Sequence, residues 1–470
     1  MEISNRTALR ILSRKYRLWW SVNIIGIAIV AILTSESVSA ETLQDAMESA
    51  YQNNPILRAE RAALRAVDEQ VPQALSGWRP TAQIDSSYGR RRDNNSGSAL
   101  GTTGTTTLTP LTMQLVVSQP LYRGGSTTAA RLEAEFRILA AREQLRSLEQ
   151  EVLLSAVIAY MDVLRDQAVL KLAHGNERVL QHQLGAVRDR FEVGEVTRAD
   201  VAQAEARLSR GVSDRIAITG RLATSRANFR RVVGHFPNKL SRVPRIRDVP
   251  KDIETAVSIA KDENPSLIAA RYIERASKHA IGVLKGELLP KLSLDGSLSR
   301  VEDSFVAGSS TNTAEIMAQV RIPIYQAGSV YSSIRQRRHT NTQRQMEIQQ
   351  TEDSVREELT QAWHRLITAR DSIRAANDQV SAARLALEEV KKEYDVGLRS
   401  TLDVLDAEQE LLDARVTVVE AERDEYVAIY ELRSGTGRLS PEHLRFNSEI
   451  YDPEVNYEGV SARWWGSDTD

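Results

Sequence analysis

Apolar and polar residues follow two different periods along this chain. Long stretches show the three-and-four spacing of amphipathic helices, whereas four short segments alternate residue by residue as strands do. The four segments lie at about 81–92, 110–121, 291–302 and 315–325. Each is about 10 residues long, which suffices to cross a bilayer as a tilted strand. The pattern predicts a mainly α-helical fold with a small β part.

The helical stretches are long and free of proline. No proline interrupts 126–236 or 329–440. Ser126 and Ser329 each follow a glycine at the end of the second strand of a pair, and we expect these serines to cap the helices that begin there. A helix from Ser126 to about Arg190 would be on the order of 100 Å long.

The helices are expected to fold back as antiparallel hairpins. Gly194 and Gly397 mark the turns after the two long helices. In the returning helix of the second half, apolar and small residues recur every seven positions, as in a coiled-coil seam. The seam residues are Val404, Leu411 and Val418 in one row and Ala407, Ala414, Ala421 and Ala428 in the other. Alanine rows let neighbouring helices approach closely.

The chain is a tandem duplication. Pro55 and Pro265 lie 210 residues apart within QNNPIL and DENPSL, and the segments FEVGEVTRADV and YDVGLRSTLDV, which start at Phe191 and Tyr394, lie 203 residues apart. We expect a first copy at 41–234, a linker at 235–250, a second copy at 251–437 and a tail at 438–470.

The first forty residues have the pattern of a secretory signal peptide. Basic residues precede an apolar run from Trp19 to Leu33, and Val38-Ser39-Ala40 offers small residues for cleavage. The run is shorter than the roughly 20 residues of a spanning helix. We therefore expect residues 1–40 to be removed on export. The sequence has no cysteine, which excludes disulfides, thiolate metal sites and a lipid-acceptor cysteine.

Charge and motifs exclude several classes of function. The 61 basic and 63 acidic residues nearly balance, so there is no net field to attract nucleic acid. The seven histidines are scattered without metal-ligand spacing, and the motifs of nucleotide-binding loops and nucleophile elbows are missing. We expect no enzyme, no metal and no cofactor.

The four strands raise the question of how a membrane barrel could close. Strands in lipid cannot leave unpaired edges, and four strands are too few for a barrel. Three chains that contribute four strands each would solve this. The alternative is a soluble four-stranded sheet.

The sequence resembles the TolC family of outer-membrane channel proteins from about residue 42 to 437. The resemblance is carried by the Asn-Pro element of both copies, by Trp78-Arg79-Pro80, by IPIYQAGS at 322–329 and by YDVGLRSTLDVLDAEQ at 394–409. It implies a homotrimer with a twelve-stranded outer-membrane β-barrel and a helical tube that narrows in the periplasm. It also implies recruitment by a periplasmic adaptor (membrane fusion) protein and an inner-membrane ABC or proton-driven transporter, for efflux or type I secretion.

The resemblance further implies a gate at the periplasmic tip, near the turn glycines. Tyr394 and Arg399 match the family's gating Tyr and Arg, and Asp200 matches the aspartate to which they bond. The first copy has Phe191 and Val196 where the second has the Tyr and Arg, so this lock would be asymmetric.

Asp403 and Asp406 match two acidic residues that ring the family's constriction. Their spacing of three places them on one helix face, and threefold symmetry would bring several carboxylates together as a cation-selective ring. A solvated helix face is the alternative for this pair.

Two alternatives stay open at this point. Arg90, Arg91 and Arg92 end the first strand beside a Gly/Thr-rich stretch at 94–109 that is expected to be a loop. These arginines would contact lipopolysaccharide phosphates or simply face solvent.

A trimeric coiled-coil surface adhesin or structural protein is the alternative to the channel. The sequence leaves the exported substrate, a small molecule or a protein, open.

Overall fold

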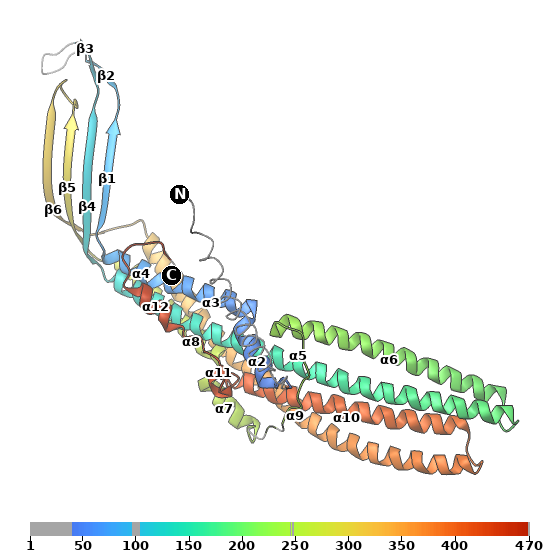
Figure 1. Ribbon diagram of the computed structural model, residues 1–470. Coiled ribbons are helices and arrows are strands. Elements are labelled where there is room, and N and C mark those ends of the chain that lie inside the picture. Colours follow the sequence, from blue (N-terminus) through green and yellow to red (C-terminus); the bar gives the residue numbers. More distant parts are fainter. Residues whose placement is uncertain (1–39, 96–103, 245, 247–248, 469–470) are drawn as a thin grey trace, which may run out of the picture.

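The molecule is elongated, with a sheet at one end and long helices aligned side by side at the other (Figure 1). The computed structural model describes residues 40–95, 104–244, 246 and 249–468, so the expected signal peptide lies outside the described residues except for Ala40. Helices α5 (Ser126–Glu192) and α9 (Ser329–Asp395) have 67 residues each and run from the sheet to the far end. At ~1.5 Å per residue each spans about 100 Å.

Shorter helices cover the two long ones. Far from the sheet, α6 (Arg198–Val233) packs against α5 and α10 (Thr401–Gly435) against α9, which confirms the two predicted hairpins. Nearer the sheet lie α2 (Leu43–Asn53), α3 (Pro55–Asp68), α4 (Gln70–Leu75), α7 (Ile253–Glu263) and α8 (Pro265–Lys285). The short 3₁₀ turns η1 (Ser76–Trp78) and η2 (Gly286–Leu288) lead into the sheet. Among the described residues, no helix is apolar over a stretch long enough to span a bilayer.

The predicted seam of α10 is largely confirmed. Val404 and Leu411 are buried, as are the alanines at 414, 421 and 428, whereas Ala407 and Val418 are half-buried. The seam packs against α9 and α5. Closely spaced helices therefore meet along the small and apolar residues that the heptad pattern identified.

The asparagine of the repeated Asn-Pro element contacts the ends of several helices in each copy. Asn54 and Asn264 cap α3 and α8, whose first residue is the proline, by accepting hydrogen bonds from backbone N–H groups of the first turn. The amide of Asn54 also donates to the Val232 carbonyl at 3.1 Å, and that of Asn264 to the Gly435 carbonyl at 2.9 Å. Because these carbonyls end the returning helices α6 and α10, one buried side chain holds three helix ends together in each copy.

The expectation that Ser126 and Ser329 cap the long helices is wrong. The capping positions are Gly125 and Gly328, which have left-handed φ angles of 76° and 77° and make no side-chain cap. Each serine is the first helical residue, and its hydroxyl donates back to a carbonyl three residues earlier, at 2.8 Å for Ser126 and 2.9 Å for Ser329. The chain turns sharply from strand to helix here, and glycine adopts the required backbone without strain.

The sheet is antiparallel, with strand order β1-β4-β5-β6. Its strands are β1 (Thr81–Tyr88), β4 (Leu111–Arg123), β5 (Lys291–Glu302) and β6 (Ser310–Arg321). Beyond it, β2 (Arg91–Asn95) and β3 (Gly104–Leu108) pair with each other as a separate ribbon.

Three strand predictions need correction. The segment at 81–92 is not one strand, because β1 ends at Tyr88 and the strand conformation is interrupted at Gly89 before β2 begins. The stretch at 94–109 is not only loop, because β2 and β3 enter it; its residues 96–103 lie outside the described residues. The last strand ends at Arg321, because Pro323 cannot donate to a ladder.

The two faces of the sheet differ in polarity. Alternate residues of paired strands project to the same face. One face is apolar and includes Ile84, Leu115, Val117, Leu294, Leu298, Ala314, Ile316 and Val320. The other face is polar and includes Gln83, Asp85, Gln114, Ser118, Asp295, Ser299, Thr313 and Gln319. None of the described residues covers the apolar face, since Ile84 and Ile316 are 73% and 79% exposed.

The linker and the tail both pack on the helices. The Tyr160 hydroxyl on α5 donates to the Ser241 carbonyl at 2.7 Å, which fixes the linker. The tail forms α11 (Pro441–Leu444) and α12 (Glu454–Ser461). Asn456 on α12 donates to buried Asp68 on α3 at 2.7 Å, so the tail holds the helices nearest the sheet.

A buried ion pair joins α3 to α5. Glu149 is 8% exposed, and its Oε1 lies 3.7 Å from Nη2 of Arg61. The Arg61 guanidinium also lies over the rings of Tyr51 and Tyr451, at 4.5 and 5.0 Å from their centroids. Burial raises the pKa of Glu149 to about 7, although Arg61 opposes the shift.

We therefore predict that stability falls as pH rises through the range between about 4.5 and 7. The folded-state pKa of Glu149 lies above its unfolded value, so protonation favours the folded state and the free energy of unfolding declines until pH passes about 7. A shift of this size corresponds to roughly 3 kcal/mol. In denaturant titrations at several pH values, Glu149→Gln should weaken the pH dependence of the free energy of unfolding. Glu151→Gln, which alters an exposed neighbour on α5, should leave that pH dependence unchanged. Stability that rises over this range in the wild type would contradict the assignment.

Candidate functional site at the helical tip

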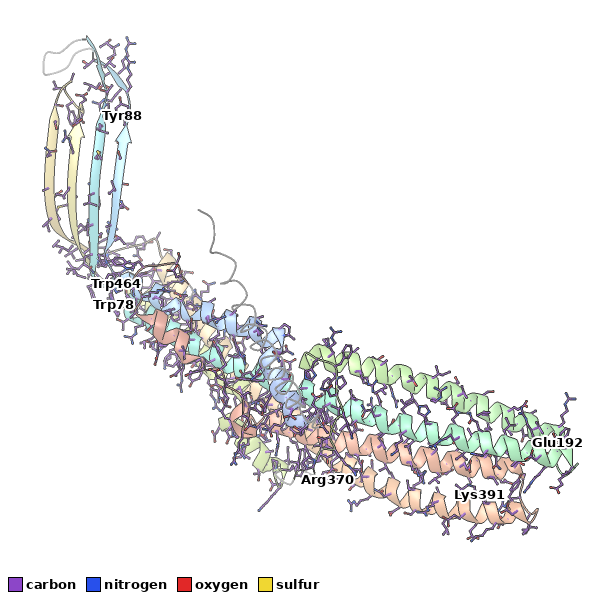
Figure 2. All side chains as sticks on the ribbon, viewed as in Figure 1. Trp78, Tyr88, Glu192, Arg370, Lys391 and Trp464 are labelled. Atoms are coloured by element: carbon purple, nitrogen blue, oxygen red, sulfur yellow. The ribbon has the colours of Figure 1, made fainter. Side chains whose placement is uncertain are left out.

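The two turns at the far end of the helices share one geometry. Figure 2 shows Glu192 and Lys391 near these turns, at the opposite end of the molecule from Tyr88 in the sheet. Gly194 and Gly397 both have φ near 80°, and their N–H groups donate to the carbonyls of Phe191 and Tyr394 at 3.0 Å. The glycines thus end the long helices in the left-handed conformation, as the sequence predicted for turn positions.

Asp200 and Asp403 occupy equivalent places at the starts of α6 and α10. Each is the third helical residue and forms a capping box with the residue before the helix. The Asp200 carboxylate accepts from the N–H and hydroxyl of Thr197 at 2.8 and 2.7 Å, and Asp403 accepts from both groups of Ser400 at 2.8 Å. These hydrogen bonds, led by those of the hydroxyls, lower the pKa of both aspartates. Both carboxylates are therefore ionised at neutral pH.

Tyr394 connects the two hairpins through an arginine that the sequence analysis did not single out. Its ring lies under the guanidinium of Arg190, which comes from α5, with 4.5 Å from Cζ to the centroid. Its hydroxyl lies 3.3 Å from the Thr401 hydroxyl at the start of α10. A cation over an aromatic ring is attracted by the ring quadrupole, so Tyr394 links α5 to α9.

Arg399 lies in the turn itself and pairs within its own hairpin. Its Nε donates to Oε2 of Glu393 at 2.7 Å, and the two side chains are 48% and 44% exposed. Exposed pairs of this kind contribute little to stability, because solvent and salt screen them. The arginine is therefore only loosely held.

Asp406 makes a second connection between the hairpins. It forms an ion pair with Arg207, which lies on α6. The Asp406 side chain is 56% exposed, so part of the carboxylate faces solvent. Sequence spacing predicted the shared helix face of Asp403 and Asp406 but not this partner.

The lock predicted from Asp200, Tyr394 and Arg399 is not formed within one chain. Among the described residues, Asp200 makes no hydrogen bond to Tyr394 or Arg399, because each of the three has another partner. The lock and the acidic ring of Asp403 and Asp406 therefore stay predictions about the assembled protein.

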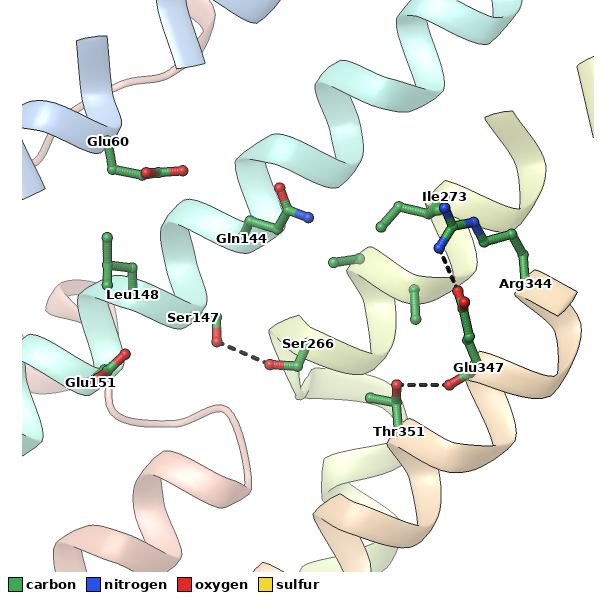
Figure 3. Close-up of a pocket in the computed structure, with 12 residues that line it drawn as sticks. Glu60, Gln144, Ser147, Leu148, Glu151, Ser266, Ile273, Arg344, Glu347 and Thr351 are labelled. Atoms are coloured by element: carbon green, nitrogen blue, oxygen red, sulfur yellow. Dashed lines mark hydrogen bonds and ion pairs between the residues drawn. The ribbon is translucent and has the colours of Figure 1, made fainter. Parts of the chain in front are cut away.

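A hollow midway along the helices is a poorer candidate (Figure 3). It lies where α5, α8 and α9 meet. The hydroxyls of Ser147 and Ser266 lie 2.9 Å apart, and Arg344 pairs with Glu347 at 2.6 Å. Because these polar groups are satisfied by one another, they present no convergent set to a ligand.

Comparison with known proteins identifies the family. The model of the family described as "Outer membrane efflux protein" matches residues 46–235 and 256–438. The outer membrane efflux protein BepC of Brucella suis biovar 1 is 36% identical over 438 residues, which cover 93% of this chain and 94% of BepC. The chain belongs to the outer membrane efflux protein family.

More distant similarities agree with this membership. The outer membrane protein TolC of Vibrio cholerae serotype O1 is 26% identical over 419 residues, 87% of this chain and 94% of that protein. A membrane protein of Pseudomonas aeruginosa has the same fold, with a TM-score of 0.76 at 17% identity over 84% of this chain and 90% of that one. The TolC resemblance is thereby confirmed.

Membership of the efflux family decides between the functional alternatives. The chain is an outer-membrane channel protein of efflux or type I secretion systems, and it extends into the periplasm. The comparisons do not support a surface adhesin. The family is one of transport channels and not of enzymes.

Arg190 and Arg207 are the tip residues that sequence reasoning missed. Arg190 directly precedes the repeated FEVG segment, at the place that Glu393 holds in the second copy. This opposite charge at matching repeat positions was a usable signal. Arg207 carries the same signal, because it matches Glu410 in the second copy, but its pairing with Asp406 depends on how the two hairpins of this efflux protein pack together.

Proposed function

We propose that the helical tip is the closable end of an exit duct whose other end is a barrel built from three sheets. Channels of this family are homotrimers that work with a periplasmic adaptor protein and an inner-membrane transporter. We assign the duct to the polar face of the sheet and its continuation between the hairpins. The transporter supplies the energy, and the chain itself carries out no chemistry.

The unpaired sheet edges carry this proposal. Strands β1 and β6 are the two edges of the sheet, and both are exposed along their whole length. Backbone groups in hydrocarbon must be paired. Pairing β1 of one copy with β6 of the next satisfies both edges, and three copies of four strands give a barrel of the size that membranes accommodate.

The polarity of the sheet supports the same arrangement. The apolar face, with Leu298 and Ile316 58% and 79% exposed, suits contact with lipid. The polar face, which carries Asp295 and its hydrogen-bonded Ser118, then lines a water-filled lumen. In this orientation the apolar face contacts lipid and the polar face contacts water.

At the tip, we propose that the channel closes when a side chain leaves a weakly bound partner in its own chain and bonds to a residue of the next chain. Arg399 leaves Glu393, with which it forms only an exposed pair, and bonds to Asp200 of the next chain. Arg207 with Asp406 and Arg190 with Tyr394 hold the two hairpins of one chain together. Opening then requires the bond between Arg399 and the next chain's Asp200 to break.

The acidic pair is predicted to make the channel cation-selective and sensitive to trivalent cations. Converging carboxylates at a narrow site attract multivalent cations and accept hydrogen bonds from the ligands of such cations. In planar-bilayer recordings, Asp403→Ala/Asp406→Ala should lose selectivity and raise the blocking concentration of hexamminecobalt(III) by about tenfold or more. Asp413→Ala, which removes an exposed carboxylate further along α10, is the matched control and should behave as wild type. Unchanged block in the double variant would place the constriction elsewhere.

Removing the proposed lock should open the channel. Arg399→Ser with Tyr394→Phe deletes the arginine pair and the tyrosine hydroxyl, and the same loss in all three chains should shift a closed–open equilibrium by roughly two orders of magnitude. Single-channel conductance should therefore rise, while native mass measurement still gives a trimer because the buried seam is untouched. The control is Arg384→Ser, which removes an exposed arginine of α9 that pairs with Glu388. Wild-type conductance in a correctly assembled double variant would refute the lock.

A further inference from the structure

One row of the sheet carries three positive charges side by side. Arg123, the last residue of β4, pairs in register with Lys291, the first of β5, and Lys291 pairs with Arg321, the last of β6. No other cross-strand row of this four-stranded sheet contains more than one charged residue. Among the described residues, these three side chains form no ion pair with an acid. We call this row the basic collar.

Such a row opposes sheet formation unless an anion offsets it. Neighbouring strands lie about 4.8 Å apart, well inside the screening length of about 8 Å at physiological salt. Like charges directly opposite one another destabilise a strand pair. The single charges elsewhere, such as Asp295 with its serine partners, are arranged without this conflict. The collar is thus the one strongly charged feature of the sheet.

Alternation assigns the collar to the polar face. Lys291 lies two residues before Ser293 and four before Asp295 on β5, and Arg321 lies two residues after Gln319 on β6, so all share one face. A bulge between Pro120 and Tyr122 restores Arg123 to the same face. Without that bulge, Arg123 would project to the apolar face.

The backbone holds the collar at the junction of sheet and helices. Three residues after Arg123 the chain enters α5, having passed through Gly124 and Gly125. A Cβ at Gly124 would lie 2.2 Å from the Gly286 carbonyl oxygen, just before β5 begins. The close approach fixes the ends of β4 and β5 together, so the cations cannot spread apart by fraying.

We propose that the basic collar lines the channel lumen where the barrel meets the helical tube, and that it binds multivalent oxyanions, with phosphate-bearing cargo as the model class. The inference rests on the proposed trimeric barrel, which repeats the row three times around the lumen. Arginine forks match phosphate oxygens bidentately, and lysine adds a point charge. The collar then attracts acidic cargo at the barrel end of the helical tube, opposite the acidic tip.

The test uses the purified full-length trimer in planar bilayers, with sodium tripolyphosphate as the probe. Tripolyphosphate should reduce the current of the wild-type channel, and its block should weaken as salt is raised. In Lys291→Gln/Arg321→Gln the blocking concentration should rise by about tenfold or more, since two cations are lost from each chain. Lys291→Arg should keep the block. The matched control is Arg300→Gln, on β5 but on the other face and paired with Glu302, and it should leave the block unchanged.

Several outcomes would overturn the proposal. Tripolyphosphate that fails to block a conducting wild-type trimer, or blocks it and the double variant equally, excludes a lumenal collar. Native mass spectra supply the second arm: if the double variant loses bound phosphatidylglycerol while block is unchanged, the cations face lipid headgroups instead. A wild-type protein that forms no channel contradicts the proposed function, whereas a channel with normal trivalent-cation block but no polyanion block contradicts only the collar.

Discussion

Strands β1 and β6 leave the backbone donors and acceptors of both sheet edges unpaired, and in hydrocarbon such groups must find partners. One chain cannot satisfy them, because its four strands do not close. Pairing between copies does so and simultaneously turns the apolar face to lipid and the polar face to a lumen. The long helices α5 and α9 continue from β4 and β6 after sharp glycine turns, so a closed ring of strands imposes a closed ring of helices.

Within each chain, the duplication solves a second problem, which is how to keep a helix of about 100 Å straight and covered. Each long helix is covered by a returning helix over one half and by separate helices over the other. Asn54 and Asn264 bind the ends of these coverings together. The copies diverge at the tip, where Arg190 faces Tyr394 and Arg207 faces Asp406. This divergence gives the two hairpins different contacts at the tip.

Periodicity and the absence of proline predicted the fold well, because long helices and alternating strands are set by local chemistry. The hairpin turns followed from Gly194 and Gly397 for the same reason. The errors at Ser126 and at the ends of the strands arose because the backbone geometry between two elements sets where each element begins and ends. Examples are left-handed Gly125 before α5 and Gly89 after β1. Pairings such as Arg207 with Asp406, and the alignment of Lys291 with Arg321, depend on packing and register that one sequence does not reveal.

Cross-linking of the sheet edges tests the trimeric barrel most directly. The chain has no cysteine, so cysteines can be placed in pairs, one at Gln83 on β1 and the other at Thr313, Glu315 or Met317 along β6, which scans the possible registers on one face. Under oxidation in the outer membrane, one register should yield a covalent trimer on denaturing gels that collapses to monomer when reduced. Intermolecular bonds absent at every register in a folded, membrane-inserted protein, or a ladder that stops at dimer, would contradict the account.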